Sequence, residues 1–167
     1  MTKETYIKIT QPFRDNPNMA RGIHMANKIC TLMMYLAYPI LVIYMFWQKD
    51  TDVARVLMVP SNSFIILSVF RYMVNRPRPY ERFELPPVIA KDTKGKSFPS
   101  RHVFSAMVIA MTYLLASPWS WLGLIFVVVA VLLAIVRVIS GVHYPSDVIA
   151  GAGFAVVAAV VGYIWCA

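Results

Sequence analysis

Five long apolar runs divide this 167-residue chain, at residues 27–47, 53–74, 103–116, 119–140 and 147–165. A helix that crosses the hydrocarbon core of a bilayer needs about 20 mostly apolar residues, a length that four of the runs supply. The third run is shorter, so its helix must begin within the preceding loop or cross the membrane with little tilt. Apolar residues make up 59% of the chain, above the roughly half that is usual for a soluble protein. The sequence therefore predicts an all-α polytopic membrane bundle with about five transmembrane helices.

The first 25 residues are too polar to form another span. Apolar and basic residues alternate there, which is compatible with a short helix lying on the membrane surface. A frayed terminus fits this segment almost as well. A secretory signal peptide would place a short apolar core directly after a basic start, and this pattern is missing. We expect an amino-terminal interfacial segment over residues 1–25.

The two cysteines, Cys30 and Cys166, both fall in apolar runs and lie far apart in the sequence. We interpret them as small core residues and not as a disulfide or a metal-binding pair.

Positive charge gathers in one stretch of the chain. The net charge is +8, and between residues 71 and 101 eight Lys or Arg residues stand against three Asp or Glu residues. Basic loops beside a membrane commonly contact anionic headgroups or stay on the cytoplasmic side. A site for a phosphorylated ligand is the other explanation. Nucleic acid is a remote third one for a membrane protein with so short a loop, and we expect no nucleic-acid partner.

Several ionisable residues stand inside or at the ends of the apolar runs. An arginine in a spanning segment must face a protein interior or extend to the interface. For Arg71 alone, extension to the membrane interface is the favoured interpretation. For Arg137, a protein interior and the interface are equally compatible with the sequence. His102 and His143 stand at or just before apolar runs, each with an arginine upstream, and Asp147 follows His143 by four residues. A carboxylate near an imidazole fixes its tautomer and raises its basicity, so the set as a whole favours a functional site.

The spacing of these residues forms three motifs in order: Arg71-x6-Arg78-Pro79, then Pro99-Ser100-Arg101-His102, then Arg137-x5-His143-x3-Asp147. The series resembles the signature of the type 2 phosphatidic acid phosphatase superfamily, which reads K-x6-R-P, P-S-G-H and S-R-x5-H-x3-D. One short motif is weak evidence. Three motifs in the family's order, at the ends of membrane helices, form a strong signal that covers about half of the chain.

The chain departs from the family pattern at three positions. Arg71 replaces a lysine, Arg101 replaces the glycine of the second motif, and Val136 replaces the serine of the third. The arginine at position 71 keeps the cation but presents a planar fork instead of a point charge. At position 101 an arginine would be strained if the backbone needed a positive φ. We expect ordinary helical dihedrals there, because the following residues favour a helix.

The resemblance implies a metal-independent phosphatase without a cofactor. In that scheme His143 attacks phosphorus to form a phosphohistidine, Asp147 orients His143, and His102 protonates the leaving oxygen before it activates water. The residues expected to bind the phosphate are Arg71, Arg78, Ser100, Arg101 and Arg137. We expect one membrane-integral domain over residues 1–167, with a catalytic loop at 75–101.

A site at the ends of membrane helices indicates a phosphorylated lipid as substrate, surrounded by membrane lipids. Undecaprenyl pyrophosphate, phosphatidylglycerophosphate and phosphatidic acid are all compatible. A lipid phosphotransferase would use the same residues, and a non-catalytic scaffold or lipid carrier is the remaining alternative. The sequence leaves the oligomeric state open.

The orientation in the cell membrane receives two opposite indications. The positive-inside rule places the basic loop in the cytoplasm, whereas the family resemblance implies an extracytoplasmic site. We favour the second, because arginines that bind a ligand are not topology signals.

Overall fold

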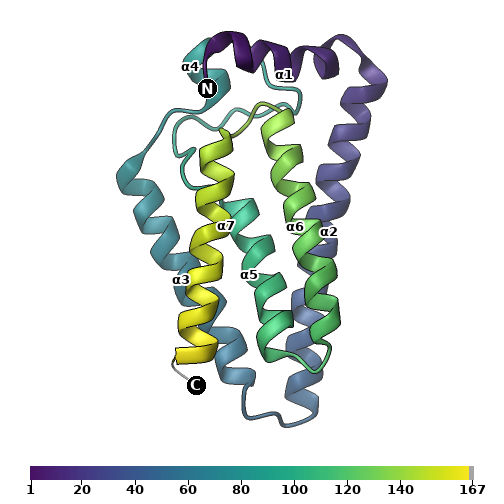
Figure 1. Ribbon diagram of the computed structural model, residues 1–167, viewed down its shortest axis with the longest axis vertical. Helices are drawn as coiled ribbons and strands as arrows, with labels where there is room; N and C mark the ends of the chain where they lie inside the picture. Colours follow the sequence, from purple (N-terminus) through teal and green to yellow (C-terminus); the bar gives the residue numbers. More distant parts are fainter. Residues whose placement is uncertain (166–167) are drawn as a thin grey trace.

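The computed structural model describes residues 1–165, and every regular element within them is helical. The amino-terminal helix α1 (Lys3–Asp15) lies across one end of a bundle formed by α2 (Pro17–Trp47), α3 (Val53–Val74), α5 (Arg101–Ala116), α6 (Ser120–Ile139) and α7 (Pro145–Val160) (Figure 1). A short helix, α4 (Pro79–Phe83), interrupts the loop between α3 and α5, and a π-helical turn at Val161–Trp165 continues α7. This confirms the predicted all-α bundle.

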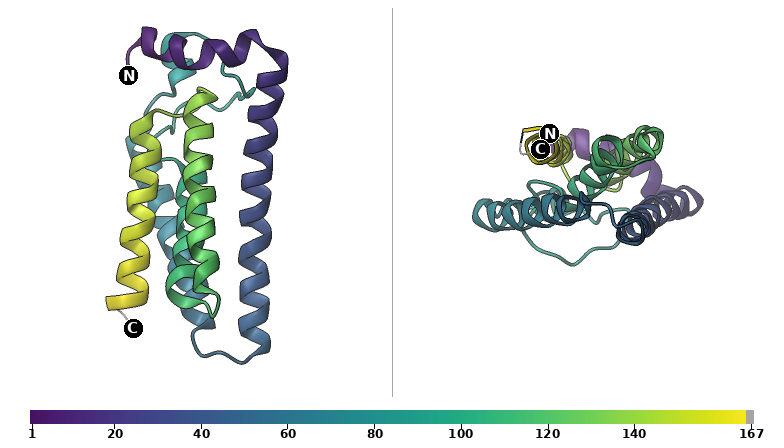
Figure 2. Two further views of the ribbon diagram at one scale, coloured as in Figure 1. Left: turned by 45° about the vertical axis from the view of Figure 1, so that its right-hand side comes forward. Right: turned by 90° about the horizontal axis from the view of Figure 1, so that it is seen from below.

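Within the described residues, four helical segments are long and apolar enough to cross a membrane: Pro17–Trp47, Val53–Phe83 (α3 with its continuation to α4), Ser120–Ile139 and Pro145–Trp165 (α7 with its π-helical turn). The fifth, α5, has 16 residues, a length of about 24 Å at 1.5 Å per residue. It lies in the middle of the bundle, and more than half of its residues are buried (Figure 2). Contacts with the other helices therefore surround α5, so it does not need to span the hydrocarbon core by itself.

Small residues on one face of α7 determine how this helix packs. Ala155 and Ala159 are completely buried, and a Cβ added at Gly151 would lie 2.7 Å from the carbonyl oxygen of Ser100. Small residues at this spacing let two helix backbones approach closely. As a result, the first turn of α7 lies against the first turn of α5, which brings the second and third motifs together.

The amino-terminal segment is divided between two helices, because α1 ends at Asp15 and α2 already begins at Pro17. Asn16 caps α2, since its side chain accepts hydrogen bonds from the backbone N–H groups of Asn18 and Met19. Cys30 is buried in the core, as predicted, and Cys166 lies outside the described residues.

Candidate active site

The third motif places His143 and Asp147 on either side of the start of α7. His143 is 1% exposed, and its Nδ1 lies 3.4 Å from Oδ2 of Asp147. A proton on Nδ1 facing that carboxylate leaves the lone pair on Nε2. The pKa of His143 is lowered below the usual histidine range, mainly by burial and in addition by the nearby Arg137 and Arg78. Asp147 raises this pKa, but its effect is smaller than that of burial. The ring is therefore neutral at pH 7, the state that a nucleophile needs.

Asp147 is held by more groups than the motif indicates. Its Oδ2 accepts hydrogen bonds from the Ser97 hydroxyl at 2.5 Å and from the backbone N–H of Tyr144 at 3.0 Å. Its Oδ1 forms an ion pair with Nη1 of Arg76 at 2.8 Å, and this guanidinium also lies over the Tyr144 ring. Three groups thus fix the carboxylate that faces His143.

No motif in the sequence indicates a role for Ser97 or Arg76. Arg76 belongs to the "RPRP" stretch beside Arg78, and Ser97 stands three residues before Ser100. Neither residue occupies a position of the three motifs. Only the path of the loop, which returns Ser97 to the start of α7, brings them to Asp147.

The three arginines of the first and third motifs are buried close to one another. The guanidinium of Arg71 donates to the carbonyl oxygens of Ser97 and Pro99. Arg78 donates to the carbonyl oxygens of Gly95 at 3.1 Å and Val142 at 3.2 Å. These partners are neutral, and within residues 1–165 no carboxylate forms an ion pair with Arg71, Arg78 or Arg137. Buried uncompensated cations are costly, so the cluster is suited to bind an anion.

Arg137 and Ser100 add unused hydrogen-bonding groups to this cluster. Nη1 of Arg137 donates to Oδ1 of Asn27 at 3.1 Å, whereas its Nε and Nη2 have no partner within residues 1–165. The hydroxyl of Ser100, the N-cap residue of α5, is likewise buried without a partner there. Such groups are rare in buried positions. Together with the amino-terminal end of α5, they form a cradle of hydrogen-bond donors that is suited to an anion.

The second motif places its arginine and its histidine side by side at the start of α5. His102 is half-buried and lies within electrostatic range of Arg137, Lys91 and His143. Arg101 is exposed and is the first residue of α5, and its φ is not positive. The expected helical dihedrals at this departure from the family pattern are therefore confirmed.

Lys91 brings another cation from the loop between α4 and α5. Burial first, and then the nearby Arg137, Arg78 and Arg71, lower the pKa of Lys91 to about 8. Both effects disfavour the charged form of the lysine. No motif in the sequence indicates that a loop lysine belongs to the site.

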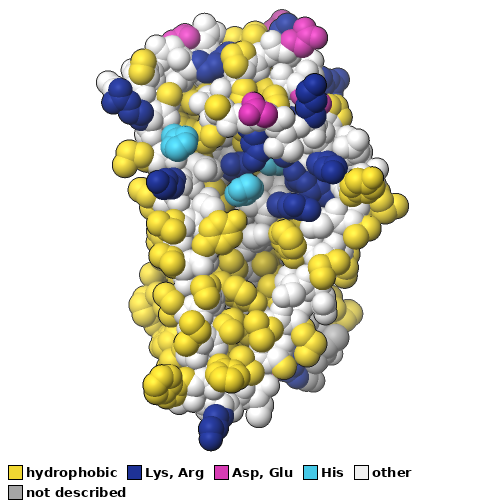
Figure 3. All heavy atoms as spheres, turned by 180° about the vertical axis from the view of Figure 1, so that it is seen from behind, with side chains coloured by type: hydrophobic (Ala, Val, Ile, Leu, Met, Phe, Trp, Pro, Cys, Tyr) yellow, Lys and Arg dark blue, Asp and Glu magenta, His cyan; other side chains and the backbone are white. Residues whose placement is uncertain are grey.

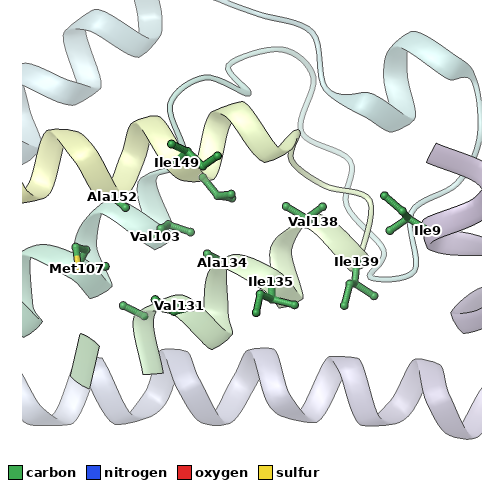
Figure 4. Close-up of a pocket in the computed structure, with 12 residues that line it drawn as sticks. Ile9, Val103, Met107, Val131, Ala134, Ile135, Val138, Ile139, Ile149 and Ala152 are labelled. Atoms are coloured by element: carbon green, nitrogen blue, oxygen red, sulfur yellow. The ribbon is translucent and has the colours of Figure 1, made fainter. Parts of the chain in front are cut away.

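Two apolar hollows lie on different faces of α5. One, of about 530 Å³, lies between α6 and α7, with Val103 and Met107 of α5 at its base and Ile9 of α1 at one end (Figure 4). It contains none of the charged motif residues. The other begins at Arg101 and His102 and faces α2 and α3. Only the second hollow is in direct contact with the motif residues.

Comparison with known proteins identifies the family to which this site belongs. The model of the PAP2 superfamily matches residues 52–167. An undecaprenyl-diphosphatase of Sulfolobus acidocaldarius is 29% identical over 118 residues, which cover 70% of this chain and 57% of that protein. The bacitracin transport permease protein BcrC of Bacillus licheniformis is 32% identical over 135 residues, or 76% of this chain and 63% of that protein. The chain thus spans about three fifths of the length of these curated relatives.

Two solved structures share the fold. LpxE of Aquifex aeolicus superposes with a TM-score of 0.73 at 21% identity, covering 95% of this chain and 92% of that one. A PAP2 type phosphatidylglycerolphosphate phosphatase of Bacillus subtilis superposes with a TM-score of 0.70 at 22% identity, covering 95% of this chain and 83% of that one. Identities this low show a common fold alone.

Proposed function

Because the chain belongs to the PAP2 superfamily, we propose that it is a membrane-integral, metal-independent phosphatase that hydrolyses a phosphomonoester or pyrophosphate on a lipid. The observation that carries the proposal is the position of His143. A neutral imidazole, oriented through Nδ1 by Asp147, lies beside buried arginines that form no ion pair with a carboxylate in the described part of the chain. A nucleophile next to a cluster of cationic hydrogen-bond donors is the arrangement that phosphoryl transfer needs.

In the proposed reaction, Nε2 of His143 attacks phosphorus and forms a phosphohistidine. Arg71, Arg78 and Arg137, with Ser100, bind the phosphoryl oxygens and stabilise the charge that develops on them. His102 donates a proton to the leaving oxygen, then takes a proton from the water that hydrolyses the intermediate. Asp147, fixed by Ser97 and Arg76, keeps the imidazole in the attacking tautomer throughout.

Substrate assignment rests on location and on the relatives. Lys and Arg side chains gather toward one end of the bundle, beside a surface that is apolar along most of its length (Figure 3). A lipid phosphate lies at that depth while its chains remain among the helices. The relatives include an undecaprenyl-diphosphatase, and a structural neighbour acts on phosphatidylglycerolphosphate. We therefore keep undecaprenyl pyrophosphate, phosphatidylglycerophosphate and phosphatidic acid as the candidate substrates.

The proposal is tested by phosphate release from these three lipids in detergent micelles containing EDTA, with a soluble phosphomonoester as comparison. We expect wild-type protein to release phosphate, and His143→Ala to lose at least about 1,000-fold in kcat, because the nucleophile is removed. Release that requires an added metal ion, or that survives in folded His143→Ala protein, contradicts the mechanism.

The same assay includes a lipid alcohol as acceptor in order to detect a phosphotransferase. Transfer of phosphate to this lipid in preference to water would assign the phosphohistidine to that second activity. If folded wild-type protein transfers phosphate to neither acceptor, the remaining interpretation is a non-catalytic scaffold or lipid carrier.

A further inference from the structure

Arg101 differs from the other motif arginines in its surroundings. Arg71, Arg78 and Arg137 are buried, whereas Arg101 is exposed, and its guanidinium lies 5.3 Å from the centroid of the Phe64 ring on α3. Within residues 1–165 no ion pair engages it. It is therefore a free cation next to the phosphate cradle but outside it.

The hollow that Arg101 lines continues into an apolar groove. A cavity of about 210 Å³ has Arg101 and His102 at one end and meets a second cavity of about 370 Å³ between α2 and α3. The two share Met34, Tyr35, Phe64, Ser105 and Ile109. Arg101 is the one Lys or Arg among the residues that line either cavity. A hydrocarbon chain fits the groove, and a charged group fits only its Arg101 end.

The position of His102 identifies this hollow as the side of the leaving group. In the proposed mechanism His102 protonates the leaving oxygen, and in-line displacement places that oxygen opposite the attacking nitrogen of His143. Because His102 and Arg101 line the same cavity, the part of the substrate that departs lies against Arg101. An alcohol leaving group brings no charge to this place, whereas a phosphate leaving group does.

We propose that Arg101 binds the inner phosphate of a lipid diphosphate, which makes lipid diphosphates the preferred substrates; this inference rests on the phosphatase function proposed above. Nε2 of His143 attacks the terminal phosphorus, and the bond from that phosphorus to the bridging oxygen breaks. The lipid monophosphate leaves with the proton of His102, and Arg101 stabilises its charge. Water then attacks the phosphohistidine, returns a proton to His102 and releases inorganic phosphate.

The test compares farnesyl diphosphate with farnesyl monophosphate, which differ only in the second phosphate. Phosphate release is measured in micelles for wild type, Arg101→Gln and Arg101→Lys. We expect Arg101→Gln to lose about 10- to 100-fold in kcat/KM on the diphosphate, the effect of one charge-assisted contact, and less than about 3-fold on the monophosphate. Arg101→Lys keeps the charge, so it should recover part of the loss.

Lys96→Gln is the matched control. Lys96 is exposed at the same end of the bundle, its ammonium group lies 4.8 Å from the Tyr72 ring centroid, and it lines neither cavity. It should leave the ratio of the two activities unchanged. Equal losses on both substrates in Arg101→Gln, or no loss on the diphosphate, overturn the inference about Arg101 alone. Wild-type protein that is inactive on both lipids overturns the phosphatase proposal, and this inference with it.

Discussion

At the scale of single residues, Asp147 illustrates how the tertiary structure completes a motif. The spacing His143-x3-Asp147 correctly indicated that the two side chains would meet, because they flank one helix start. The spacing contained no information about Ser97 and Arg76, which reach Asp147 from 50 and 71 residues away. A buried carboxylate needs such partners to remain ionised.

Lys91 provides a prediction about pH. Its pKa is lowered to about 8, so the ligand-free protein loses this positive charge as the pH rises from 7 to 9. A bound phosphate favours the charged form and raises the pKa again. We therefore expect kcat/KM to fall above pH 8 while kcat changes less, in initial-rate measurements across this range. Lys91→Arg should abolish the fall, since arginine stays protonated. An unchanged fall in that variant would assign the titration to another group.

At the scale of secondary-structure elements, α1 has a role that its composition did not reveal. The sequence indicated an interfacial segment, and the structure shows that one face of α1 packs on the loops of the candidate site. Tyr6 is fully buried, and its hydroxyl donates to the carbonyl oxygens of Leu85 at 3.4 Å and Gly141 at 3.5 Å. Gly141 has a φ of +76°, and a Cβ there would lie 2.6 Å from the Tyr6 hydroxyl. α1 therefore packs on the turn that leads to His143.

Tyr6→Ala should disturb both stability and catalysis. Removing a buried aromatic ring costs about 3 kcal/mol of unfolding free energy or more. A displaced Gly141 turn would also misplace His143, so we expect kcat to fall by at least about 10-fold with little change in KM. Thermal unfolding and initial rates in the same detergent measure the two effects. Lys8→Ala, an exposed position on the same helix, serves as control. A normal kcat in destabilised Tyr6→Ala protein would limit α1 to a structural role.

At the scale of the whole molecule, the helices set the position of the site relative to the membrane. α1 and the described end of the chain at Trp165 lie at opposite ends of the bundle (Figure 1). The candidate site lies at the α1 end, beside the turns that α1 covers. Once one end is assigned to a side of the membrane, the side of the site follows.

We propose that the α1 end faces the extracytoplasmic side. The test places single cysteines at the exposed positions Lys8, which precedes α2, and Lys49, which follows it. The background is a variant whose native cysteines are replaced by serine. The cysteines are labelled in intact cells with a membrane-impermeant maleimide. We expect labelling at position 8 and protection at position 49 until the membrane is permeabilised. The reverse pattern would place the site in the cytoplasm, as the positive-inside rule indicates.

The sequence by itself determined the helical bundle and the residues of the three motifs, because hydropathy over about 20 residues and short spacings at helix ends are local properties. Only the tertiary structure decided which groups surround them. Ser97 and Arg76 on Asp147, Tyr6 beside Gly141, and Arg101 at the end of the groove between α2 and α3 all depend on how loops and helices pack. Contacts between segments far apart in the chain produce no periodic pattern in the sequence, so only the tertiary structure reveals them.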